Sequence, residues 1–225
     1  MPLLLDYTIE KETRIGLWQI DESNDWFIEQ LKLTSYEKDN LRSMKEHRQK
    51  EWLSSRWLCH ILSDKEERIK LRKDACGKPH FENFQKHLSL SHSKDKVAAI
   101  ISNTKVGIDI EKIDQKIFRI EGKFISPTES LAIDQNKNLE ACHVFWGSKE
   151  AMYKAYGKRE LDFKKDMHLF PFRIFQNNIE LKGTVRKKDV FQEYHIYAQK
   201  INEFYLIYSI LDHEVNLSID SNNSQ

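Results

Sequence analysis

The stretch from Val106 to Glu111 reads VGIDIE, and its apolar residues alternate with a glycine and two acidic residues. A period of two is the signature of a β-strand, in which residues two apart point to the same face. Asp109 and Glu111 are therefore expected to lie side by side, with Cα atoms about 7 Å apart. Adjacent carboxylates repel unless a proton or a cation lies between them, and Mg²⁺ accepts such oxygen ligands. The alternative is a solvent-exposed strand face.

The stretch from Phe145 to Lys158 reads FWGSKEAMYKAYGK and predicts a helix, because it has no proline and many helix-forming residues. Residues four apart share a helix face, so Glu150 and Lys154 are expected to lie on the same side. Glu150 would add a third carboxylate to the pair on the strand, with the Lys154 cation beside it. The alternative is an ordinary surface ion pair.

Taken together, the two stretches resemble the 4′-phosphopantetheinyl transferases, and most closely their larger Sfp-type class. GIDIE at residues 107–111 is followed by WxxKEAxxKAxG at residues 146–157. Shorter agreements are GKP at 77–79, SHS at 91–93 and FxSPxE at 124–129. The likeness extends from about Arg48 to about Leu161. One departure is the loop after Gly157, which lacks the second glycine that the family commonly has there.

The resemblance implies an α+β fold, a pseudo-dimer of two similar α/β halves with the active site in the cleft between them. Residues 1–104 would form the half that contacts the CoA phosphates. Residues 105–217 would form the half with the metal and catalytic residues. The polar tail 218–225 is expected to be disordered, and the class is monomeric.

The implied reaction transfers the 4′-phosphopantetheine arm of coenzyme A to a serine of an apo acyl or peptidyl carrier protein and releases 3′,5′-ADP. The resemblance assigns Mg²⁺, or Mn²⁺, to Asp109, Glu111 and Glu150. Glu150 would also accept the serine proton, directly or through a water, and Lys154 would neutralise phosphate charge. The implied CoA contacts are Arg48, Arg56, Lys78, Ser91, His92, Asp109 and Lys154. Which arginine binds the 3′-phosphate, and which pathway the carrier serves, stay open.

Basic residues gather before and within the predicted helix from Lys45 to Leu62. They could bind phosphate, because Arg and Lys complement its oxygens, or they could form a solvated helix face. Residues 88–93 predict a strand that ends in a small polar loop. A histidine and backbone amides there could hold a pyrophosphate, although a lone histidine is more often structural.

Residues 112–124 predict an amphipathic segment. Its cations are interleaved with isoleucines: the cations are Lys112, Lys116, Arg119 and Lys123, and the isoleucines are Ile113, Ile117 and Ile120. Carrier proteins are generally acidic around the modified serine, so this surface is a candidate for carrier docking. The alternative is that the isoleucines pack inward and the cations are only solvated.

The remaining elements are expected from period and capping signals. One or two strands should lie in residues 1–20, and helices in 21–63, with Ser23 and Asp25 as candidate caps of the first helix and a cap at Thr34 for the second. Residues 97–101 should be a buried strand. A helix should open at Ser126 and continue through 130–141. Four strands should form a meander: 169–175, 179–185, 193–199 and 204–211.

The composition of the chain argues against several other functional classes of protein. The chain has 225 residues, of which 32% are charged, and its net charge is +1. A net charge this close to zero does not favour nucleic-acid binding by the chain as a whole. The three widely spaced cysteines, an odd number, favour reduced thiols in a cytoplasm. The start MPLLLD predicts no signal peptide, and no apolar run approaches membrane-spanning length. Two alternatives to the enzyme are kept: a catalytically silent CoA- or carrier-binding protein of the same fold, and an unrelated α+β interaction module.

Overall fold

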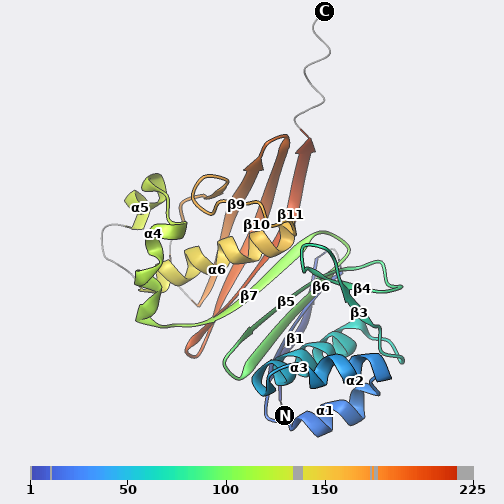
Figure 1. Cartoon of the computed structure of the whole chain (residues 1–225). Coiled ribbons are helices and arrows are strands. Elements are labelled where there is room, and N and C mark those ends of the chain that lie inside the picture. Colours follow the sequence, from blue (N-terminus) through green and yellow to red (C-terminus); the bar gives the residue numbers. More distant parts are fainter. Residues whose placement is uncertain (1, 11, 134–138, 173, 175–176, 217–225) are drawn as a thin grey trace, which may run out of the picture. The chain divides into compact units, whose positions relative to one another are not determined.

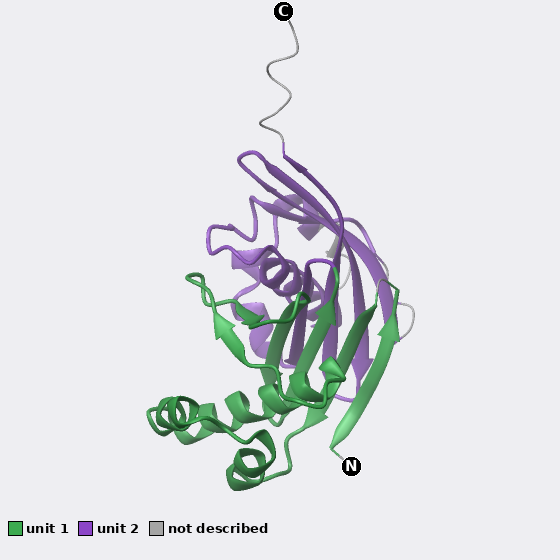
Figure 2. Ribbon diagram, turned by 90° about the vertical axis from the view of Figure 1, so that its right-hand side faces the viewer, with its two compact units in different colours: residues 1–103 green, residues 104–225 purple. Residues whose placement is uncertain are grey.

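The computed structural model describes residues 2–10, 12–133, 139–172, 174 and 177–216. Helices and antiparallel sheets both contribute to the chain, so the predicted α+β class is confirmed. The chain divides into two compact units, Met1–Asn103 and Thr104–Gln225, which Figure 2 distinguishes by colour. The functional roles assigned to the two halves stay predictions.

Unit 1 is an antiparallel sheet covered by helices. Its strand order is β1-β2-β6-β5, with the bounds Leu3–Ile9, Thr13–Gln19, Lys96–Ser102 and His87–Ser93. A separate hairpin joins β3 (Leu71–Lys73) to β4 (Pro79–Phe81). The helices are α1 (Asn24–Leu31), α2 (Ser35–Arg42) and α3 (Glu46–Ser63), and α3 packs on β6 and β2.

The helix starts of unit 1 follow the predicted caps. The Ser23 side chain accepts a hydrogen bond from the backbone N–H of Trp26. Thr34 and Glu37 form a reciprocal capping box at the start of α2. Leu53, Leu58 and Leu62 of α3 are buried, and they join the core formed with β6.

Unit 2 is a second antiparallel sheet with the strand order β7-β11-β10-β9-β8. The bounds are Val106–Lys112, Phe204–Asn216, Val190–Ile201, Asn178–Lys187 and Met167–Leu169. Helix α6 (Leu139–Tyr156) packs against β7 and β11, as Figure 1 shows. Shorter helices lie between β7 and α6: η1 (Gln115–Arg119), α4 (Glu121–Phe124) and α5 (Pro127–Ile133). Each unit therefore sets an 18-residue helix, α3 or α6, against an antiparallel sheet.

Several predicted elements need correction. Residues 91–93 lie inside β5 and pair with β6, so the predicted polar loop is instead a strand end. The segment 112–124 is not one amphipathic helix, because Lys112 ends β7 and the helical turns fall into η1 and α4. Of the described residues in the predicted strand 169–175, only Leu169 lies in a strand: β8 ends there, before Pro171, a residue without the N–H that a strand ladder needs. Residues 134–138 of the predicted helix, part of the predicted strand, and the tail 218–225 lie outside the described residues.

The contact between α6 and β7 depends on glycine. A Cβ added to Gly107 would lie 1.8 Å from the carbonyl oxygen of Ala151 in α6. A Cβ added to Gly147 would lie 2.4 Å from Cδ1 of Ile207 in β11 and 3.5 Å from Oδ2 of Asp109. The helix backbone can therefore approach the sheet more closely than it could with any other residue at position 107.

We expect Gly107→Ala to lower the free energy of unfolding by about 3 kcal/mol, because the new methyl group meets helix backbone that cannot rotate away. Gly122→Ala in α4 is the matched control, since nothing lies within 4 Å of its added Cβ. The control should be neutral or stabilising by up to about 1 kcal/mol. Urea denaturation of the two variants measures both effects, and equal midpoints would contradict the close contact.

Candidate active site

Strand β7 and helix α6 bring the predicted acidic residues and Lys154 to one place in unit 2. Asp109 is buried in the middle of β7, opposite Ile207 of β11, and Glu111 follows two residues later on the same face. Glu150 and Lys154 lie on α6, which packs over this strand. The alternation in the sequence thus predicts the strand correctly.

Lys154 makes its shortest contact with Asp109. Its Nζ donates to Oδ1 of Asp109 at 2.6 Å and to the carbonyl oxygen of Ile108 at 3.0 Å. Asp109 is 4% exposed, so Lys154 compensates a charge that has almost no access to water. The Lys154 charge also lowers the pKa of Glu150, but burial has the larger, opposite effect.

Glu111 and Glu150 both have pKa values above the ordinary range of a glutamate. Burial raises the pKa of Glu111 to about 7, and the negative charge of Asp109 adds to the rise. Burial likewise raises the pKa of Glu150 to about 7, again with a contribution from Asp109. The indole Nε1 of Trp146 donates to Oε1 of Glu111 at 3.4 Å. The negative charge of Asp109 therefore disfavours the ionisation of both glutamates.

This donor set fits a hard divalent cation, because carboxylate oxygens are the ligands that Mg²⁺ and Mn²⁺ prefer and their mutual repulsion would be relieved. In the side-chain positions of the described ranges, however, no group of three or more His, Cys, Asp or Glu residues is gathered closely enough to hold a metal ion. The chemistry of the site suits the ion, and the side chains would have to turn toward one another to ligate it.

In unit 1, two predicted CoA contacts meet at a carboxylate that sequence reasoning missed. Oε2 of Glu51 accepts a hydrogen bond from Nη1 of Arg48 at 3.3 Å and lies 3.1 Å from Nε2 of His92. Arg48 and Glu51 lie on α3, whereas His92 lies on β5. Ser91, the residue before His92, is buried. The i,i+3 spacing of Arg48 and Glu51 on the predicted helix could have indicated this ion pair from the sequence.

The other predicted CoA contacts in unit 1 lie elsewhere. The Arg56 guanidinium lies 3.4 Å from the ring centroid of Trp52 and donates to the Trp52 carbonyl oxygen. This side chain is therefore turned onto its own helix, and its burial lowers the pKa of Arg56 to about 10. Lys78 lies in the β3–β4 turn, where its backbone N–H donates to Asp74.

In the predicted docking surface, residues 112–124, the expected apolar stripe is not exposed. Ile117 is buried, and Ile113 and Ile120 pack against the core of unit 2, so they form no exposed apolar stripe. The cations remain at the surface: Lys116 and Arg119 are exposed, and Lys112 is half-buried and pairs with Glu203 at 3.0 Å. The apolar residues pack inward because η1 and α4 lie against α6.

Comparison with known proteins supports the family predicted from the motifs. The family model of the 4′-phosphopantetheinyl transferase superfamily matches residues 105–207. The 4′-phosphopantetheinyl transferase gsp of Aneurinibacillus migulanus is 31% identical over 151 residues. That match covers 64% of this chain, and the chain spans 63% of the length of that relative. Residues 105–207 thus match the 4′-phosphopantetheinyl transferase superfamily, which supports the family predicted from the motifs over the unrelated interaction module.

Asp109, Glu111, Glu150 and Lys154 all lie inside the matched range. Two further charged residues of this range, Glu129 and Lys149, belong to the quoted motifs but received no role from the sequence.

Among the described residues, no helix combines the length and the apolarity needed to cross a bilayer.

We expect Lys154→Met to lower the free energy of unfolding by about 1–3 kcal/mol, because Asp109 keeps its buried charge and loses its cation. The exposed Lys158, just beyond α6, offers a matched control, and Lys158→Met should stay within about 0.5 kcal/mol of the wild type. Urea denaturation in EDTA measures both without interference from bound metal. If the two variants were equally stable, Lys154 would not be compensating a buried charge.

Proposed function

We propose that this protein transfers the 4′-phosphopantetheine arm of coenzyme A to a serine of an apo carrier protein, in a Mg²⁺-dependent reaction that releases 3′,5′-ADP. The observation that carries this proposal is the meeting of Asp109, Glu111, Glu150 and Lys154 where α6 crosses β7. These residues fall within the range that matches the transferase superfamily.

The proposed roles follow from the chemistry of each side chain. In the transfer, the serine oxygen forms a bond to the phosphorus that bears the pantetheine arm, and the bond from that phosphorus to 3′,5′-ADP breaks. Glu150 takes the serine proton, directly or through a water, since a pKa of about 7 suits proton transfer near neutral pH. Lys154, 27% exposed at its side chain, supplies positive charge to the leaving phosphate.

Asp109, Glu111 and Glu150 are the side chains that would hold the metal ion. When bound, Mg²⁺ would neutralise pyrophosphate charge. Asp109 is the best anchored of the three, because Lys154 and the burial beneath α6 fix its position.

For CoA, we propose Arg48, Lys78, Ser91 and His92 of unit 1 as phosphate contacts. Arg48 is exposed, whereas Arg56 is folded against Trp52, so Arg48 is the better candidate for the 3′-phosphate. A phosphate there would compete with Glu51 for the Arg48 guanidinium.

The test is incubation with CoA, Mg²⁺ and the apo carriers of the source organism, read by intact mass. The wild type should add the mass of phosphopantetheine to a carrier. Asp109→Ala and Glu150→Gln should each lower kcat/KM by at least about a hundredfold, and Glu150→Gln should unfold at a temperature near that of the wild type. Normal labelling by Asp109→Ala would contradict the metal assignment. CoA binding without labelling of any carrier would instead favour a catalytically silent binding protein.

We further propose that Lys116 and Arg119 contribute to carrier docking by charge alone. The double variant Lys116→Glu and Arg119→Glu should raise the KM for carrier about tenfold and weaken its salt dependence, because exposed charges mainly steer encounter. The KM for CoA should not change. Charge reversal at the exposed Lys188, in the β9–β10 turn, is the control. An equal rise in the KM values for carrier and for CoA, or unchanged carrier kinetics, would refute the assignment of Lys116 and Arg119 to carrier docking.

A further inference from the structure

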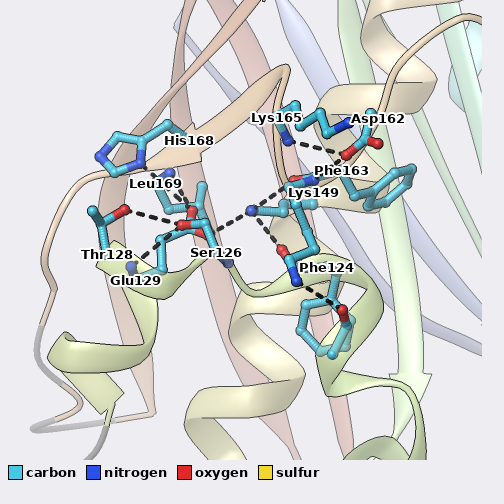
Figure 3. Close-up of polar contacts among 12 residues, drawn as sticks. Phe124, Ser126, Thr128, Glu129, Lys149, Asp162, Phe163, Lys165, His168 and Leu169 are labelled. Atoms are coloured by element: carbon cyan, nitrogen blue, oxygen red, sulfur yellow. Dashed lines mark hydrogen bonds and ion pairs between the residues drawn. The ribbon is translucent and has the colours of Figure 1, made fainter.

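A second charged pair of unit 2 is more deeply buried than any member of the proposed active site. Nζ of Lys149 on α6 lies 2.7 Å from Oε2 of Glu129 on α5, and the two side chains are 0% and 1% exposed. Figure 3 shows the pair enclosed by neighbouring segments. A buried ion pair is rarely more stabilising than apolar residues of the same volume, so stability alone is a weak reason for its presence.

The hydrogen bonds of the pair join several segments of unit 2. Lys149 also donates to the carbonyl oxygens of Phe124 at 2.7 Å and Phe163 at 2.8 Å, which uses all three of its N–H groups. Glu129 also accepts from the backbone N–H groups of Ser126 and Leu169, both at 2.9 Å. The end of α4, the start of α5, the loop after α6 and strand β8 are thereby held to one point of α6 (Figure 3).

The two carbonyl groups that Lys149 holds belong to residues whose rings contact Trp146. The ring centroids of Phe124 and Trp146 are 5.1 Å apart, and those of Phe163 and Trp146 are 5.6 Å apart in a stacked arrangement. The Trp146 indole in turn donates to Oε1 of Glu111 at 3.4 Å. A continuous series of contacts therefore runs from the buried pair to a carboxylate of the proposed active site.

We propose that Glu129 and Lys149 are positioning residues, which hold Phe124 and Phe163 around Trp146 so that its N–H fixes the carboxylate of Glu111. This inference rests on the proposed function for the importance of Glu111. Partners that hydrogen-bond to a metal-ligating side chain orient it, and their loss typically costs about 10-fold to 100-fold in metal affinity. Lys149 and Glu129 act on Glu111 only through Trp146.

The position of Trp146 can be measured directly. Trp18, Trp26, Trp52 and Trp57 lie in unit 1, so Trp146 is the one tryptophan in the sequence after residue 103. Protein labelled with 5-fluorotryptophan should give a ¹⁹F resonance that disappears in Trp146→Phe. Glu111→Gln should shift that resonance and leave those of unit 1 unchanged.

The decisive variant is the double change Glu129→Gln and Lys149→Met, which removes both charges together. It should shift or broaden the Trp146 resonance and weaken Mn²⁺ binding about tenfold, measured without CoA by the electron paramagnetic resonance of free Mn²⁺. Trp146→Phe keeps a ring between its neighbours and removes the N–H, so it should weaken Mn²⁺ binding equally. Combining all three changes should add no further loss.

Lys200→Met is the matched control, because Lys200 pairs with Glu140 at the other end of the same helix. It should leave the Trp146 resonance and Mn²⁺ affinity unchanged. If the double variant does not fold, Phe163→Leu tests the same series of contacts, because it removes one ring against Trp146 and keeps the backbone carbonyl.

An unmoved Trp146 resonance in the double variant, or in Phe163→Leu, would overturn the inference, as would normal Mn²⁺ affinity in Trp146→Phe. The failure of the proposed function looks different. In that case the wild type labels no carrier, yet the Trp146 resonance still responds to the buried pair and to Glu111→Gln.

Discussion

The close approach of α6 to β7 is the contact on which the rest of unit 2 depends. It is possible because Gly107 presents no side chain to the helix backbone at Ala151. Asp109, two residues along the same strand, is consequently covered by the helix and nearly removed from water. A buried carboxylate requires a cation, and Lys154 on the covering helix provides it at 2.6 Å. Backbone packing thus determines the electrostatics of the site.

Helix α6 carries two lysines, Lys149 and Lys154, whose surroundings differ. The difference suits one lysine to a structural role and the other to contact with a ligand. Lys149 has its three donors used by Glu129 and by backbone carbonyls, and it has no exposed surface. Lys154 is bound to Asp109 but stays partly open to solvent, where a ligand phosphate could reach it. One lysine is therefore suited to hold neighbouring segments in place, and the other to meet a substrate.

Sequence reasoning predicted the strand at 106–112, the α6 helix and the caps at Ser23 and Thr34, because period and capping are local properties of the chain. At residues 112–124 it predicted an amphipathic segment but did not show that the segment is divided between the end of β7 and two short helical turns. It failed after Leu169, where Pro171 ends the pairing. Amphipathicity shows that a segment has a buried face, and tertiary packing decides whether one regular helix forms it.

The sequence by itself predicted the family that residues 105–207 match, and it determined the residue types of the candidate site, because its motifs are contiguous and carry distinctive chemistry. It placed Glu150 and Lys154 on one helix face, since i,i+4 spacing is set by the helix. Only the tertiary structure decided that Lys154 bonds to Asp109, that Glu51 joins Arg48 to His92, and that Lys149 is buried against Glu129. Those partners lie on elements that are distant from one another in the sequence. The hydrophobic periodicity of a single element cannot predict which residues of other elements it will contact.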